Sequence, residues 1–203
     1  MKSFIIHELK MEKESLEYNL KKNSQLTLVL VVSQAIDADV HVVVRLTGRG
    51  ASAKVIGLVV GRGDHKIAIH TEQIHEAPET TSNLLVKAAL YGRTQFSYDG
   101  IIRVERSAQQ SDAYQKNENL LLSPQSHARS DPALEILAND VRCTHGSTTG
   151  KINEDQLWYL TSRGLSIPGA KQLLVEGFFQ HAISTVSDTI NQERIRKTLW
   201  QVT

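Results

Sequence analysis

Apolar and polar residues alternate with a period of two over the first two thirds of the chain. Short runs rich in valine and isoleucine lie at 26–33, 38–48, 53–61, 65–74, 81–90 and 100–105. Successive side chains of an extended strand point to opposite faces, so this alternation predicts strands. Turn residues such as Gly48, Gly61 and Gly92 separate the runs, and no helical period lies between them. The pattern therefore predicts a sandwich, a barrel or a β-solenoid.

The turns favour the solenoid among these three architectures. Asp99-Gly100 is the one dipeptide typical of a tight hairpin, and Asn-Gly is absent. Strands without hairpin turns or crossover helices are more consistent with coils that stack on each other than with an antiparallel meander. No strict repeat motif decides the matter. We expect parallel rungs over residues 24 to about 140.

A helical period replaces the strand period after Gly150. Asn153 and Gln156 form a capping-box pattern, and Gly164 stands where that helix would stop. A second helix is expected from Pro168, and Ser187 can cap a third that carries Ile190, Ile195 and Leu199. The sequence thus predicts a β domain at 1–150 and a helical domain at 151–203.

The second helix carries adjacent apolar pairs that could face the body of the protein. Leu173, Leu174, Phe178 and Ala182 recur at helical spacing, so we expect this stripe to face inward. Phe179 lies beside the stripe. An exposed aromatic residue with a polar rim is typical of an interface anchor, and Phe179 is therefore the candidate residue for binding a partner.

Composition narrows the class of protein and its compartment. The 203 residues carry a formal net charge of +1 and 5% aromatic residues, too little basic excess and too few stacking platforms for a nucleic-acid-binding protein. A single cysteine cannot form an internal disulfide, which favours a reducing compartment. No signal-peptide core or run of eighteen apolar residues is visible. We expect a cytoplasmic protein without a membrane segment.

Motifs typical of enzymes are missing or incomplete. The run GSTTGKI at 146–152 has three residues between its glycines, and Ile152 stands where a P-loop needs serine or threonine, so it is not a nucleotide loop. His65, His70 and His75 are five residues apart, so successive members would point to opposite faces of one strand and could not share a metal. Without an acid–base pair that stands out, we expect no enzymatic activity.

Cys143 and His145 form the one candidate ligand pair. Residues two apart on a strand face the same side, so the thiolate and the imidazole can reach one ion. Zinc, iron and iron–sulfur clusters accept this donor set. The run 135–145 would place both residues on the face of Glu135, Leu137 and Asn139. Two donors leave a tetrahedral ion incomplete, and a lone cysteine is often a small buried apolar residue, so spacing alone keeps both readings open.

Residues 111–165 resemble the SufB/SufD family of iron–sulfur cluster assembly proteins. The likeness consists of DAYQ, NLLLS, the core P-x-LEI-x-x-x-DV-x-C-x-HG that ends at Gly146, then INEDQLWYL and SRG. Upstream, HEAPETTSNLLVKAAL at 75–90 resembles a threonine-rich rung of the same family. The likeness extends over roughly residues 70 to 184 and is nearer to the SufD side of the family.

The resemblance implies a right-handed parallel β-helix with a C-terminal helical region. It also implies a scaffold subunit without catalytic activity that works with an ABC-type ATPase, similar to SufC, and with a SufB-like subunit. In that family the C-terminal helices dock the ATPase, and clusters are thought to form where two β-helices meet. The implicated histidine falls on His145 and the neighbouring cysteine on Cys143, which makes both tentative ligands of a transient iron–sulfur cluster.

Full-length family members are longer and carry an N-terminal helical region, whereas in this sequence the strand pattern starts almost at once. A short form would need capping of its β-helix or would work as a homodimer. The alternative function is a β-helical interaction protein that binds no cluster and docks an ATPase through its helices. An enzyme acting on a small molecule at the β-helix flank has the least support.

Overall fold

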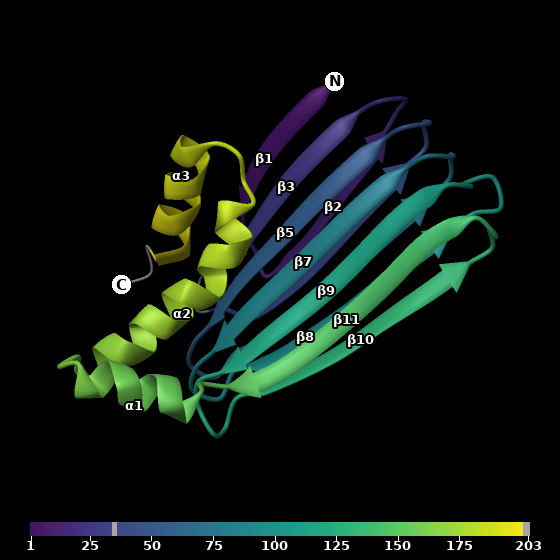
Figure 1. Ribbon diagram of the computed structural model, residues 1–203. Coiled ribbons are helices and arrows are strands. Elements are labelled where there is room, and N and C mark those ends of the chain that lie inside the picture. Colours follow the sequence, from purple (N-terminus) through teal and green to yellow (C-terminus); the bar gives the residue numbers. More distant parts are fainter. Residues whose placement is uncertain (34–35, 201–203) are drawn as a thin grey trace.

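The computed structural model describes residues 1–33 and 36–200. Eleven strands in this part of the chain wind into a flattened solenoid, and three helices follow (Figure 1). The strands are β1 (Lys2–Glu8), β2 (Lys13–Leu20), β3 (Gln25–Val32), β4 (Ala38–Leu46), β5 (Ser52–Gly61), β6 (Lys66–His75), β7 (Thr81–Leu90), β8 (Gln95–Val104), β9 (Ser111–Leu121), β10 (His127–Ile136) and β11 (Val141–Lys151). The helices are α1 (Glu154–Ser162), α2 (Ile167–Ser184) and α3 (Thr189–Trp200).

The strands alternate between two parallel sheets. Sheet A has the order β1-β3-β5-β7-β9-β11, and sheet B has the order β10-β8-β6-β4-β2. Every strand therefore pairs with the strand one full turn away in the same sheet, as Cys143 of β11 does with Ala113 of β9. The prediction of a parallel β-helix followed by helices is confirmed. Asp99-Gly100 lies inside β8 and makes no hairpin.

One corner of the solenoid is built from stacked left-handed residues. Asn23, Gly50, Glu79 and Gln110 all have φ between 56° and 70°. Each donates its backbone N–H to a carbonyl of the next turn, for example Asn23 to Arg49 at 3.0 Å. A left-handed residue at this corner directs the chain into the other sheet instead of folding it back on itself, so the solenoid needs no hairpin dipeptides.

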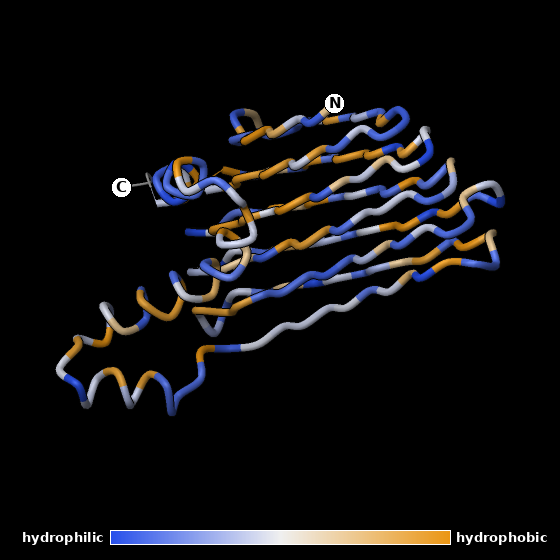
Figure 2. Tube along the Cα trace, turned by 45° about the horizontal axis from the view of Figure 1, so that its top comes forward, coloured by the Kyte–Doolittle hydropathy of each residue, from blue (hydrophilic) through white to orange (hydrophobic). Residues whose placement is uncertain are grey.

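The interior changes character along the stack. Leucine and valine fill the space between the sheets in the early turns, with Leu28, Val42 and Val55 almost fully buried. The later turns bury polar side chains instead, among them Gln115 and Asn117. Figure 2 shows the same trend, because β11, which leads into α1, is mostly white and blue.

Helices α2 and α3 cover the outer face of sheet A. They share an apolar cluster with that sheet, formed by Val29, Ile56, Leu58, Val175, Phe179, Ile183, Ile195 and Leu199 among others. The Lys87 ammonium of β7 lies 4.2 Å from the centre of the Phe178 ring and donates to the Phe178 carbonyl at 2.7 Å. Helix α1 buries none of its residues and projects from the end of the solenoid (Figure 1).

The predicted starts of the first two helices are confirmed, and that of the third is off by one residue. Asn153 caps α1 by accepting a hydrogen bond from the Gln156 amide at 3.0 Å. Ser166 caps α2, and its second residue is Pro168. The third helix begins after Asp188, whose carboxylate accepts from the Ile190 amide, so the predicted cap at Ser187 is displaced by one residue.

The predicted orientation of Phe179 is wrong. The side chain has 0% exposure and contacts the rings of Phe178 and Trp200, with centroids 5.2 and 6.0 Å apart. Leu173, expected inside, is 46% exposed, whereas Ala182 of the same predicted stripe is buried and Phe178 packs against the apolar cluster, as expected. Two adjacent apolar pairs allow two stripes on one helix, and the stripe through Val175 and Phe179 is the one that meets sheet A. Phe179 is therefore a core residue and not an exposed anchor.

The predicted continuous strand at 135–145 is also wrong. A corner at Leu137–Asp140 separates β10 from β11, so Glu135, Leu137 and Asn139 do not share a strand face with Cys143. The backbone turns here because the Leu137 amide still donates to Val104, while Asp140 already donates to the Gln109 side chain of the neighbouring turn. None of the described helices has the length and apolar character needed to cross a membrane.

Candidate functional site

The solenoid ends in an open turn formed by β10 and β11. Within the described residues β10 pairs only with β8, and β11 pairs only with β9. Each strand therefore leaves one edge of backbone N–H and C=O groups without a neighbouring strand. Unpaired edges of this kind are templates for another strand. The two candidate ligands lie on β11 at this end.

Register places Cys143 and His145 on the inner side of the last turn. Cys143 pairs with Ala113 and His145 pairs with Gln115, and both partners are buried inside the solenoid. Side chains in register on parallel strands share a face, so the thiol and the imidazole point the same way. The prediction that residues 143 and 145 share one strand face therefore agrees with the register.

Cys143 is half-buried at the corner between β10 and β11. It packs against an apolar cluster that includes Ile102, Val104, Ala113 and Ala138. Burial raises the pKa of the Cys143 thiol, a backbone hydrogen bond with Ala113 lowers it, and the charge of Asp112 raises it further. The net shift is upward, so the protonated thiol predominates at neutral pH in the absence of a metal.

His145 is exposed, although it points to the inner side. No further turn covers β11 among the described residues, so solvent reaches a position that is buried in β9. The sequence also allows a histidine that is buried and hydrogen-bonded between the last rung and the first helix, and the exposure of His145 shows that this alternative is wrong. An exposed imidazole can bind an ion together with groups from another molecule.

The floor beneath His145 is polar. The side-chain oxygen Oε1 of Gln115 accepts a hydrogen bond from the side-chain Nε2 of Gln73 at 3.3 Å. The other two polar atoms of these side chains, Gln115 Nε2 and Gln73 Oε1, have no hydrogen-bond partner within the described residues. Nearby, Thr71 and Tyr98 bond through their hydroxyls at 2.9 Å. Buried polar groups without partners lower the stability of a fold, so packing alone does not explain why glutamines occupy these interior positions.

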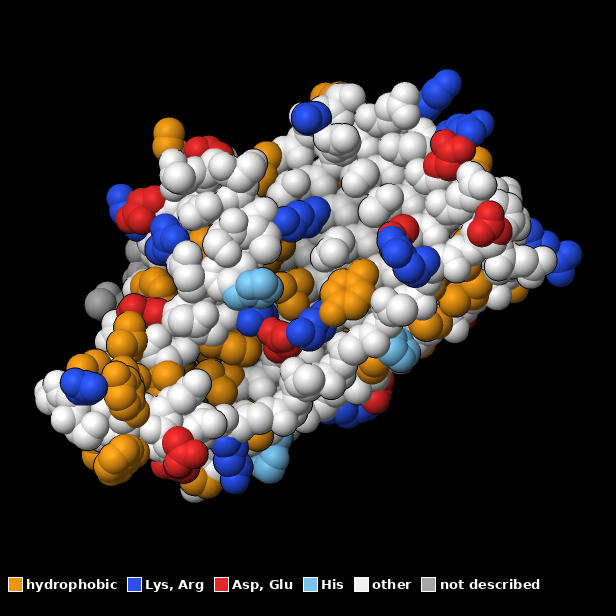
Figure 3. All heavy atoms as spheres, in the orientation of Figure 1, with side chains coloured by type: hydrophobic (Ala, Val, Ile, Leu, Met, Phe, Trp, Pro, Cys, Tyr) orange, Lys and Arg blue, Asp and Glu red, His pale blue; other side chains and the backbone are white. Residues whose placement is uncertain are grey.

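The helical extension carries a separate surface that the sequence reading missed. Trp158 is 71% exposed and Tyr159 is 53% exposed on α1, and Ile167 and Leu173 are also exposed on α2. Orange side chains gather over this part of Figure 3. The available signal was the helical spacing of Leu157 and Leu160, which face inward and leave Trp158 and Tyr159 outside.

The fold and the open end define a parallel β-solenoid with an imidazole and a thiol at an unpaired strand edge. A family model described as "SUF system FeS cluster assembly, SufBD core domain" matches residues 10–178 of this chain. That match covers most of the sequence. The chain therefore belongs to the SufBD family, and the family implies a role in iron–sulfur cluster assembly.

Individual relatives agree with this assignment. An iron–sulfur cluster assembly SufBD family protein of Mycobacterium leprae is 33% identical over 160 residues, which is 75% of this chain and 41% of that protein. The chloroplastic protein ABCI7 of Arabidopsis thaliana is 34% identical over 121 residues, or 59% of this chain and 26% of its own length. The chain thus spans less than half the length of these relatives.

Proposed function

We propose that this chain is a scaffold subunit on which an iron–sulfur cluster is assembled at the open end of the solenoid. The observation that carries the proposal is the position of His145 and Cys143 on β11. They face the same side, and the adjacent strand edge is free to receive another chain. Two donors cannot complete a cluster site, so the remaining ligands come from the partner on that edge. No residue is assigned a catalytic role.

The two donors differ in how easily they can bind a metal ion. The exposed imidazole of His145 can bind iron without rearrangement. Cys143 must lose a proton whose pKa burial has raised, and its sulfur lies against apolar neighbours. We therefore assign His145 as the first ligand, with Cys143 joining when the metal displaces its proton.

Anaerobic reconstitution with ferrous iron and sulfide tests this assignment. We expect visible cluster absorption from the wild-type chain with its partner, its loss in His145→Ala, and a reduced yield in Cys143→Ser. His127→Ala is the matched control, because His127 is an exposed histidine at the start of β10 in the same turn. Equal absorption in His145→Ala and the control would refute the ligand role.

The half-buried, protonated Cys143 is the observation that favours the alternative, an interaction protein that holds no cluster. Under that alternative His145→Ala and Cys143→Ser leave partner binding and iron content unchanged. Cys143→Ser then lowers only the free energy of unfolding, because a polar atom replaces sulfur in the apolar corner. Iron and sulfide analysis of the purified complex therefore separates the two functions.

The partner on the strand edge is a SufB-like subunit or a second copy of this chain. Pairing along β11 would satisfy the free backbone groups of the edge and bring a second set of donors beside His145. Hydrogen exchange of the β11 amides, measured with and without the partner, follows this contact. Exchange in β11 that stays fast in the complex would place the interface elsewhere.

An ABC-type ATPase is the second proposed partner, and the α1–α2 surface is its proposed dock. Trp158 replaces Phe179 as the candidate anchor because Trp158 is exposed and large aromatic side chains dominate interface energies. We expect Trp158→Ala to weaken co-elution with the ATPase while the fold is unchanged. Ile190→Ala on α3, equally exposed at 71%, is the matched control. Undiminished binding by Trp158→Ala would exclude this anchor.

A further inference from the structure

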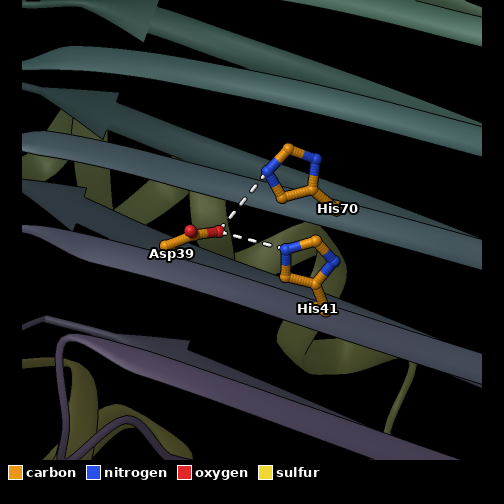
Figure 4. A group of neighbouring side chains, drawn as sticks. All are labelled: Asp39, His41 and His70. Atoms are coloured by element: carbon orange, nitrogen blue, oxygen red, sulfur yellow. Dashed lines mark ion pairs between the residues drawn. The ribbon is translucent and has the colours of Figure 1, made fainter.

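Three potential metal ligands converge on the outer face of sheet B, away from β11. His41 of β4 and His70 of β6 are direct register partners, and their rings stack with centroids 4.4 Å apart and planes 18° apart. Asp39 precedes His41 by two residues and so shares its face. Figure 4 shows the carboxylate pointing between the two imidazoles.

The distances fit a metal site. Asp39 Oδ1 lies 3.2 Å from His41 Nε2 and 3.5 Å from His70 Nε2, and all three donor atoms lie within 4.8 Å of one another. Metal–ligand bonds of about 2.0–2.1 Å place neighbouring donors of a tetrahedral zinc ion about 3.3–3.4 Å apart. The two measured edges bracket that value, and the two imidazole nitrogens lie within 4.8 Å of each other, so the stacked rings would turn toward the carboxylate to bind one ion.

The environment of the Asp39 carboxylate also favours a cation at this place. Asp39 Oδ1 is shielded from solvent and accepts no hydrogen bond within the described residues; its nearest polar neighbours are the two imidazole nitrogens, which it meets as ion pairs at 3.2 and 3.5 Å. A carboxylate oxygen in that position is costly unless a positive charge satisfies it. The exposed Lys13 ammonium is 3.9 Å away and faces the other oxygen, Oδ2. Oδ1 therefore remains available to a cation.

The surroundings also orient one ligand. His70 Nδ1 lies 3.3 Å from Asp99 Oδ2, on the next strand of sheet B. The negative charge of Asp99 favours the proton on the near nitrogen, Nδ1, and ligating histidines usually have such a carboxylate beside their second nitrogen. Asp99 thus favours the His70 tautomer in which Nε2 faces Asp39 and His41.

We propose that Asp39, His41 and His70 bind one divalent transition metal ion of the Zn²⁺ class. Two imidazoles and one carboxylate suit zinc, and the partial exposure of the three side chains leaves a fourth position for water. The ion would connect β4 to β6, which are consecutive turns of the solenoid. The site shares no residue with the donors on β11, so a negative result for one proposal leaves the other unaffected.

Calorimetric titration with Zn²⁺, and absorption after titration with Co²⁺, test the site in the full chain. The titrations use a Cys143→Ser/His145→Ala background, so the end site cannot contribute. We expect one ion per chain and a roughly 100-fold or greater loss of affinity in His41→Ala and in His70→Ala. Asp99→Ala should weaken binding by about 10- to 100-fold, because it removes only the orienting contact.

His65→Ala is the matched control. His65 Nδ1 faces Asp37 at 3.4 Å, a histidine–aspartate pair outside the three-donor cluster. Its removal should leave Zn²⁺ affinity unchanged. Circular dichroism of each metal-free variant verifies the fold, and His70→Gln replaces any alanine variant that misfolds. A dissociation constant for Zn²⁺ above about 1 mM in the background chain would overturn the proposal, and so would equal Zn²⁺ affinities of the His41, His70 and His65 variants.

Discussion

Acid should destabilise this solenoid through one buried histidine, His75 at the end of β6. The residue has 0% exposure, and its ring lies between a hydroxyl of the turn before β7 and one of β7 itself, with Nδ1 2.7 Å from Thr80 Oγ1 and Nε2 2.8 Å from Ser82 Oγ. Thr80 in turn bonds Ser111 at 2.8 Å. Burial lowers the pKa of His75 to about 4 from 6.5, with a small opposing effect from the charge of Asp112.

The shift fixes the sign and the size of the effect. Between pH 6.5 and pH 4 the unfolded chain binds a proton at His75 that the folded chain does not, so the free energy of unfolding falls as the pH falls. The full stability contributed by the neutral ring is present above pH 6.5. Each pKa unit corresponds to about 1.4 kcal/mol, which gives a loss of about 3 kcal/mol on reaching pH 4.

Urea unfolding at intervals between pH 7.5 and pH 4 measures this loss. His75→Gln keeps an amide that can bond both hydroxyls but cannot titrate, so its stability should vary less with pH than that of the wild type by about 3 kcal/mol. Carboxylates of the fold titrate equally in both proteins and cancel. His127→Gln, an exposed histidine, should retain the wild-type slope. Parallel curves for wild type and His75→Gln would refute the reasoning.

Two further predictions concern side-chain packing, and a third concerns the free edge of β11. Phe179→Ala should lower the free energy of unfolding in urea by about 3–5 kcal/mol, because it removes a fully buried ring between sheet A and the helices. Leu173→Ala, on the exposed side of the same helix, should lower it by less than about 1 kcal/mol. Similar losses in the two variants would contradict the assignment of the buried stripe. Gly100→Ala should cost about 1–3 kcal/mol, because a Cβ there would collide with the buried Gln115 amide, and an unchanged melting temperature would show that this interior is loosely packed. Thr144→Lys/Thr148→Lys should weaken association with the partner at the β11 edge without unfolding the chain, which light scattering would detect, and unchanged association would exclude that edge as the interface.

Much of the fold follows from local pattern. The alternation in 26–33, 38–48 and 81–90 predicted β3, β4 and β7 to within about two residues, because half-buried strands repeat every two positions. The strands at both ends, β1, β2, β10 and β11, carry many charged and small polar residues and are only partly buried, so their apolar signal is weak even where inward and outward positions alternate, as in β2 and β10. Their structure depends on pairing with a neighbouring turn, which the sequence does not display.

The candidate site was predictable only in part. The spacing of Cys143 and His145 indicated one strand face, but exposure of His145 depends on the position of β11 at the end of the stack. The cluster of His41 with His70 escaped the sequence reading for a similar reason. Their separation equals one turn of the solenoid, and turn length is visible only once the rungs are aligned.

The two strands of the last turn differ in how their free edges are protected. β10 carries charged side chains along its outer face, Arg129, Asp131 and Glu135, and Pro132 interrupts its run of backbone donors. Charges and proline are the usual devices that prevent a strand edge from pairing. β11 has neither between Cys143 and Gly150, apart from His145 itself. Of the two strands that end the solenoid, β11 is thus the one suited to receive another chain, and it is also the strand that carries both proposed cluster ligands.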